Sequence, residues 1–152
     1  MASTTTGRLT DSPNRLVGAV FGVVYLLVGL LGFAVTGFDD FAGRDTDEML
    51  LGFELNPLHN IVHLVIGLAG LLSWRRLDYS RAYGWALTVG YGATFVYALF
   101  AVKEEDINSL SLNAADNGLH LISALAGLAA ALWPVRSADH VRITADEGVP
   151  RA

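Results

Sequence analysis

Two pairs of ionisable residues lie at helical spacing within apolar stretches of the chain. His59 and His63 are four residues apart, and Asp116 and His120 repeat this spacing in a later segment. Residues four apart lie on one face of a helix, so each pair would direct two donor groups the same way. Imidazole and carboxylate groups bind divalent transition metals. The four side chains are therefore a candidate metal site.

Two other functions are compatible with the same pattern. His63 and His120 on facing helices have the chemistry of axial ligands to a b-type haem, and three glycines would leave room for the macrocycle. These glycines are Gly67, Gly70 and Gly127. Ionisable groups within a membrane are also candidates for proton or ion passage.

The polar residues also have a purely structural interpretation. Asn56 and Asn113 precede the two segments and are suitable helix N-caps. Asp116 lies three residues beyond its cap, where a carboxylate stabilises the positive helix end. Asn60 and Asn117, together with the deeper histidines, would form hydrogen bonds between helices. We favour this interpretation, in which the polar groups form an inter-helix network and no cofactor is bound.

The polar residues recur because a longer segment recurs. Residues 56–71 and 113–128 match at a constant offset of 57, with eight identities in sixteen positions. A weaker match at an offset of 66 covers the stretches that precede them, and it pairs Arg15 with Arg81, Gly18 with Gly84 and Tyr25 with Tyr91. The repeat predicts two helical hairpins in tandem, related by an axis along the membrane normal.

Long uncharged runs predict that these hairpins lie in a membrane. Charged residues make up 16% of the chain, against about 25% in soluble domains. A helix needs about 20 apolar residues to cross the hydrocarbon. We predict membrane helices at about residues 16–37, 56–74, 82–102 and 114–135. The predicted fold is an all-α integral membrane protein, a four-helix bundle with pseudo-two-fold symmetry.

The basic residues predict the orientation of the bundle. Eight of the ten Lys and Arg residues lie in the two tails and in the turn between the second and third helices. Because basic loops stay in the cytoplasm, both termini are expected to be cytoplasmic and the protein to lie in the plasma membrane. We predict a disordered tail at residues 1–14, a transmembrane domain at 15–135 and a polar tail at 136–152.

Composition and motifs exclude several classes of function. The chain has no cysteine, so it offers neither a disulfide nor a thiolate ligand. No basic cluster with interleaved aromatic residues indicates nucleic-acid binding, and no nucleophile with a base, phosphate loop or hydrolase carboxylate pair indicates an enzyme. The expected partners are the lipid bilayer and either a second copy of the chain or another membrane protein.

The chain resembles a known family of small membrane proteins. The pattern Asn-x-x-His-Asn-x-x-His at residues 56–63, with an apolar helix before it and two after it, is similar to domain of unknown function 4383, common in actinobacteria. The resemblance covers about residues 14–135 and implies four membrane helices. The family has no established activity to transfer.

We therefore expect a non-enzymatic accessory or scaffold protein of the membrane, whose polar stripe fixes the packing of its helices. The alternative is a transition-metal or b-type haem protein, ligated by histidine, in membrane electron transfer or sensing. A third class is transport, which would require several copies of the four helices to line a path.

Overall fold

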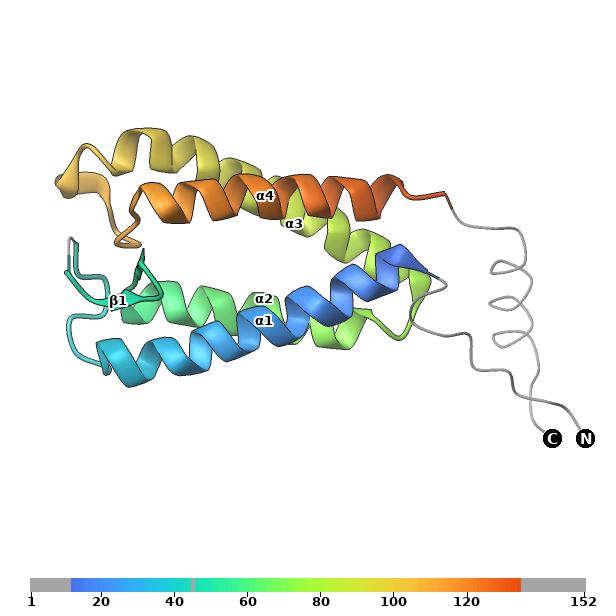
Figure 1. Cartoon of the computed structure of the whole chain (residues 1–152), viewed down its shortest axis with the longest axis horizontal. Coiled ribbons are helices and arrows are strands. Elements are labelled where there is room, and N and C mark those ends of the chain that lie inside the picture. The colour runs from blue at the N-terminus through green and yellow to red at the C-terminus, as the bar shows by residue number, and fades with distance from the viewer. Residues whose placement is uncertain (1–11, 45, 135–152) are drawn as a thin grey trace, which may run out of the picture.

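Four α-helices account for most of the computed structural model, which describes residues 12–44 and 46–134. Residues 1–11 of the predicted N-terminal tail and the whole tail at 136–152 lie outside the described residues. Figure 1 shows the helices running side by side, with the short elements gathered at one end. In chain order the elements are α1 (Pro13–Thr36), β1 (Met49–Leu50), β2 (Phe53–Glu54), α2 (Pro57–Ser73), α3 (Leu77–Ala101), the short 3-10 helix η2 (Glu105–Ile107) and α4 (Ala114–Leu132).

The ends of the helices follow from local chemistry. α1 begins at Pro13, whose fixed φ suits a first turn. It ends where Gly37 adopts a φ of 62°, a conformation that L side chains rarely adopt. α3 begins at Leu77, five residues before the predicted start at residue 82, so the turn before it is very short. α4 ends at Leu132, because the extended Trp133 precedes a proline.

Three of the helices are long and apolar enough to cross a membrane. They are α1, α3 and α4, with 24, 25 and 19 residues. α2 is apolar too, but it has 17 residues. The prediction of four helices is confirmed, and the capacity to span a membrane is borne out for these three.

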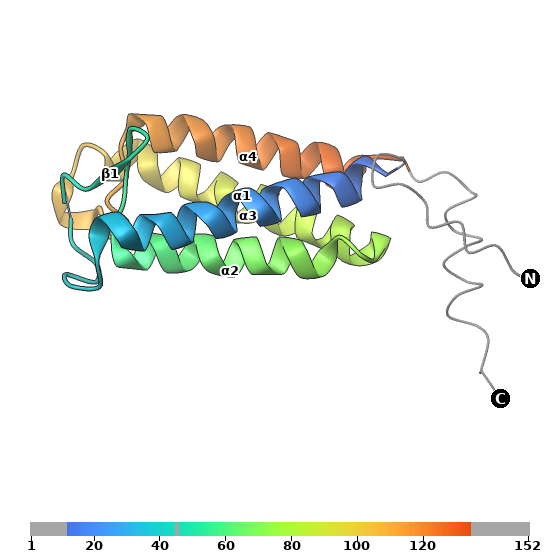
Figure 2. The same cartoon turned by 60° about the horizontal axis from the view of Figure 1, so that its bottom comes forward.

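The helices pack as two close pairs. α1 lies along α2 and α3 lies along α4, with fewer contacts between the pairs. The views in Figures 1 and 2 agree that α2 and α4 lie diagonally across the bundle. These two helices carry the histidines, so their side chains must fill the space along the bundle axis.

Glycines allow the close approach within each pair. A Cβ atom added to Gly70 of α2 would lie 2.8 Å from the carbonyl oxygen of Gly18 in α1. In the other pair, a Cβ added to Gly127 of α4 would lie 2.7 Å from the carbonyl oxygen of Gly84 in α3. Small residues at such crossings are typical of membrane helix pairs.

Polar side chains lie inside the bundle while large apolar ones lie outside. Leu30, Leu31, Leu72 and Val89 each expose half or more of their surface. The buried polar or ionisable side chains include Asn14, Asn56, His59, Asn60, His63, Ser73, Ser80, Asp116, His120 and Ser123. Exposed apolar faces around a polar interior are the arrangement expected of a protein surrounded by lipid.

Candidate metal centre

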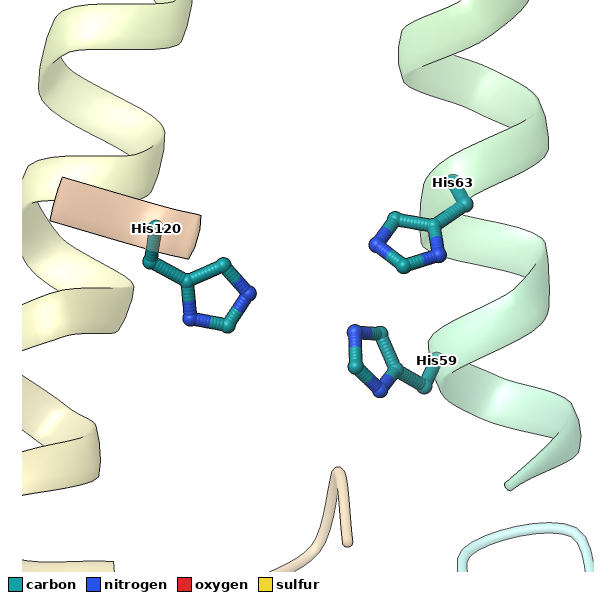
Figure 3. A group of neighbouring side chains, drawn as sticks. All are labelled: His59, His63 and His120. Carbon is teal, nitrogen blue, oxygen red and sulfur yellow. The ribbon is translucent and has the colours of Figure 1, made fainter. Parts of the chain in front are cut away.

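Three histidines meet inside the bundle near the end that carries the short elements. His59 and His63 come from the first two turns of α2, and His120 comes from the second turn of α4. One ligand nitrogen of each residue lies within 4.8 Å of the others. Figure 3 shows the rings of His59 and His63 on one side and that of His120 on the other, each with a nitrogen toward the space between them.

All three imidazoles are buried, with exposed fractions of 2%, 3% and 2% for His59, His63 and His120. Nδ1 of each ring is buried and forms no hydrogen bond of normal geometry with the described residues. For His59, the backbone carbonyls of Glu54 and Leu110 lie close enough to interact with the ring. Buried polar groups nearly always have a partner, so the Nδ1 atoms of His63 and His120 are exceptions among the described residues.

Two tyrosines form a second layer against the histidines. Tyr25 lies against His63 with ring centroids 5.1 Å apart, and Tyr91 stacks on His120 at 5.3 Å. The tyrosine rings also stack on each other at 5.2 Å. Both tyrosines are buried. The histidines therefore face apolar ring surfaces on the side that leads into the bundle.

The hydroxyl groups of these tyrosines differ in their partners. Tyr25 Oη lies 2.6 Å from Ser123 Oγ, which is a hydrogen bond from α1 to α4. Ile66 stands 57 positions before Ser123, at the matching place in α2. Tyr91 Oη lies near the Tyr25 side chain but forms no hydrogen bond of normal geometry. An isoleucine in place of a serine accounts for the missing partner.

Asp116 lies outside the group of three histidines. Its Oδ2 accepts hydrogen bonds from the backbone N–H of Asn113 at 3.0 Å and of Glu54 at 3.2 Å. Asn113 in turn accepts from the N–H of Asp116, which completes a capping box at the start of α4. Of the four metal ligands predicted from the sequence, the structure brings three together and places the fourth in a helix cap.

The two cap asparagines also join the halves of the molecule. Asn56 is fully buried, accepts from the N–H of His59 at 2.8 Å and donates to the carbonyl oxygen of Ser109 at 2.9 Å. Asn113 donates to the carbonyl oxygen of Gly52 at 2.9 Å. Each asparagine thus caps its own helix and binds the loop that precedes the other. This supports the predicted capping role and fixes the backbone beside His59.

Asn60 and Asn117 do not play equivalent parts. Asn60 Nδ2 donates to Thr36 Oγ1 at 2.9 Å, which links α2 to the end of α1. Asn117 Oδ1 is buried and has no hydrogen bond with the described residues. An inter-helix bond is therefore present for the first asparagine only.

The loops close the bundle above the histidines. β1 and β2 form a small antiparallel hairpin in which Met49 pairs with Glu54 and Leu50 with Phe53. Leu55 follows this hairpin and Leu112 precedes α4, and both are buried almost completely. Two almost fully buried leucines thus lie in the loops at the end of the bundle where α2 and α4 begin. Neither the hairpin nor η2 was predicted from the sequence.

The glycines that would make room for a haem face neighbouring helices. A Cβ atom on Gly67 would lie 2.7 Å from Cα of Leu26. Gly70 and Gly127 lie at the close helix crossings with α1 and α3, respectively. Little space for a haem therefore remains beside the histidines, because three imidazole rings and two tyrosine rings already occupy this region.

The chemistry of the site follows from its donors. Three imidazole nitrogens within reach of one point can bind a single transition-metal ion. Among the residues that the structure describes, no carboxylate belongs to the group. The tyrosine pair was not predicted to belong to the site, although the offset of 66 matched Tyr25 with Tyr91 and thus marked them.

Comparison with known proteins identifies a family without a described activity. The family model for "Domain of unknown function (DUF4383)" matches residues 15–133. No curated protein matches the chain, and no solved structure matches it.

Proposed function

We propose that this chain, which belongs to the family of the domain of unknown function DUF4383, is a four-span membrane protein that binds a transition-metal ion with His59, His63 and His120. The observation that carries the proposal is the convergence of three buried ligand nitrogens within 4.8 Å of one another. In Figure 3 the nitrogen that points toward the other rings is in each case Nε2, the one farther from Cβ. A single metal ion in the space between the rings would be within reach of all three of these nitrogens.

A metal ion suits the site better than a b-type haem. A haem needs a flat cavity between its axial ligands. Here Tyr25 and Tyr91 cover His63 and His120, and His59 lies 4.4 Å from His63 between ring centroids. A single ion needs only the small space on which the three nitrogens converge.

The packing of α2 supports its inclusion as a fourth membrane span. Its 17 residues give a length of about 26 Å, slightly less than the hydrocarbon thickness of about 30 Å. It packs closely along α1, which is long enough to span, and it exposes Val65, Leu68 and Leu72. With the basic residues on the other side, the histidine end would face outward and both termini would be cytoplasmic.

Duplication of a hairpin is supported by hydrogen bonds that recur at the offsets of the repeat. Arg15 Nε donates to the carbonyl oxygen of Trp74 at 2.8 Å, and Arg81 Nε donates to that of Ala131 at 3.1 Å. Arg81 is the match of Arg15 at an offset of 66, and Ala131 the match of Trp74 at 57. Equivalent bonds in the two hairpins are what copying one hairpin would produce.

A second set of equivalent bonds crosses between the hairpins. Asn14 Nδ2 donates to the carbonyl oxygen of Ala130 at 2.5 Å, and Ser80 Oγ donates to that of Ser73 at 3.0 Å. Ser80 matches Asn14 at an offset of 66, and Ala130 matches Ser73 at 57. Each hairpin therefore donates a side-chain hydrogen bond to a backbone carbonyl of the other hairpin at matching positions. A two-fold axis between the hairpins would require such a pair of bonds.

The proposed role is non-enzymatic. His59 and His63 belong to the first hairpin and His120 to the second, so a bound ion would cross-link the two halves. The inter-helix polar network would still fix the packing, and the ion would complete it. A membrane accessory or scaffold component is the function class that such a cross-link serves.

Elemental analysis tests the proposal. The protein should be purified in detergent with an affinity tag that contains no histidine, then exposed to buffered transition metals and desalted. We expect about one equivalent of metal per chain, lost in His120→Asn and retained in His140→Ala, which removes the fourth histidine of the sequence. Substoichiometric metal in every sample, or equal loading of His120→Asn, would contradict the proposal.

A further inference from the structure

We infer that the ion held by His59, His63 and His120 is monovalent copper, Cu(I), rather than a divalent ion. The inference rests on the proposed function and specifies its ligand. It draws on the charge around the site, the orientation of the helices, the surroundings of the imidazoles and the number of donors.

The group of donors carries no negative charge. Neutral imidazoles bind metals, so a divalent ion at this site would keep both of its charges. The cost of burying an ion rises with the square of its charge, and it is large in a medium of low dielectric. The nearest acid on α4 is Asp116, whose carboxylate already accepts two backbone N–H groups at a helix cap. A single charge is therefore strongly favoured over two.

The helix ends add positive potential to the site. α2 begins at Pro57 and α4 at Ala114, so the histidines lie in the first two turns of both helices. The N-terminal end of a helix carries a partial positive charge of about half an electron charge. Asp116 offsets this charge for α4, whereas α2 has no acidic residue in its first turn. The helix end of α2 therefore adds to the cost of a second positive charge on the ion.

Two of the three imidazoles, those of His63 and His120, lack the outer partner that divalent sites use. Histidines that bind zinc nearly always donate their second N–H to a carboxylate, a carbonyl or water. Nδ1 of His63 and His120 has no such acceptor among the described residues, and tyrosine rings cover these imidazoles instead. An outer partner raises the basicity of a ligating imidazole, so imidazoles without one bind a divalent ion less strongly.

The number of donors agrees with this choice. Copper(I) is stable with two or three ligands, whereas zinc and nickel complete four or more positions and draw water for the remainder. The three imidazoles are only 2–3% exposed, and the tyrosine pair lies against His63 and His120. A site of three imidazoles without ready water favours the ion with the lowest coordination number.

Competition between metals tests the inference. The detergent-purified protein is equilibrated anaerobically, with a reductant, against copper(I) and zinc(II), each buffered by a chelator to the same free concentration. Metal content is then measured by mass spectrometry. We expect copper to exceed zinc by at least about tenfold. If zinc equals or exceeds copper, the inference is wrong but the proposed function stands. If neither metal binds, both are wrong.

A matched pair of variants isolates the effect of charge. His63→Asp keeps three donors and adds one negative charge, so it should shift the ratio toward zinc by about tenfold. His140→Ala should leave the ratio unchanged. If circular dichroism of His63→Asp shows the helicity of the wild-type protein, the variant is folded. The competition between copper and zinc in the wild-type protein does not depend on this variant. An unchanged ratio in folded His63→Asp would overturn the explanation by charge.

Discussion

Tyr25 and Tyr91 stack on each other near the bundle axis, with ring centroids 5.2 Å apart and planes inclined by 24°. They stand at matching positions of the sequence repeat, and each lies against a histidine of its own hairpin. The arrangement around them is nearly symmetric, except for one hydroxyl group. Ser123 forms a hydrogen bond with Tyr25, whereas the matching position in α2 is Ile66, which has no hydroxyl group. This difference makes the two tyrosines a natural matched pair for experiment.

Tyr25→Phe and Tyr91→Phe should differ in stability. Tyr25→Phe removes a buried hydrogen bond and leaves Ser123 to its bond with the carbonyl of Leu119, so we expect a loss of about 1 kcal/mol in the free energy of unfolding. Tyr91→Phe removes a hydroxyl that has no hydrogen bond, so stability should be unchanged or slightly higher. Reversible unfolding in mixed micelles measures both. Equal losses would show that the Tyr91 hydroxyl has a partner.

The glycine crossings should be sensitive to a single methyl group. Gly127→Ala places a Cβ 2.7 Å from both the Gly84 carbonyl oxygen and Leu87 Cβ, so the helices must separate. We expect a loss of about 1–3 kcal/mol in unfolding free energy. Gly90→Ala is the control, because nothing lies within 4 Å of its added Cβ, and it should be neutral or stabilising. A stable Gly127→Ala variant would contradict the close approach of α3 and α4.

Much of this arrangement could be predicted because polar residues are conspicuous in apolar segments. The spacing of His59, His63 and His120 predicted side chains on the inner faces of two helices, and these three do meet. Asn56 and Asn113 could be predicted as caps because cap chemistry is local. The starts of α2 and α4 follow from the same caps.

The remainder depends on tertiary contacts that spacing cannot encode. Asp116 and His59 occupy matching positions, which suggested matching roles, but a carboxylate at that place bonds to backbone N–H groups whereas an imidazole turns inward. The β1–β2 hairpin was missed because each strand has two residues. The start of α3 at Leu77 was missed because a search for uncharged runs excludes Asp78 and Arg81, which lie within the helix.

Cysteine labelling tests the predicted orientation, because the chain has no cysteine of its own. Asp39→Cys and Glu104→Cys lie at the histidine end, and Arg75→Cys lies at the opposite end. In intact cells, a maleimide that does not cross membranes should label the first two and reach Arg75→Cys only after permeabilisation. The reverse pattern would invert the topology, and labelling of all three from outside would exclude the membrane arrangement.

Metal binding should stabilise the protein and should weaken in acid. A free metal concentration one hundred times the dissociation constant adds about 2.7 kcal/mol to the free energy of unfolding. Imidazoles must be deprotonated to bind, so protons compete with the metal and the affinity falls as the pH is lowered. Thermal unfolding with and without metal, at pH values of about 7.5 and 3.5, measures both effects. His120→Asn should unfold at the same temperature with or without metal.

X-ray absorption spectroscopy of the metal-loaded protein reports the atoms around the ion and so identifies its ligands. We expect a first shell of nitrogen atoms alone, with the outer scattering of three imidazole rings and loss of one ring in His63→Asp. A first shell dominated by oxygen, or a spectrum identical in wild type and His120→Asn, would place the metal elsewhere and contradict binding by the three histidines.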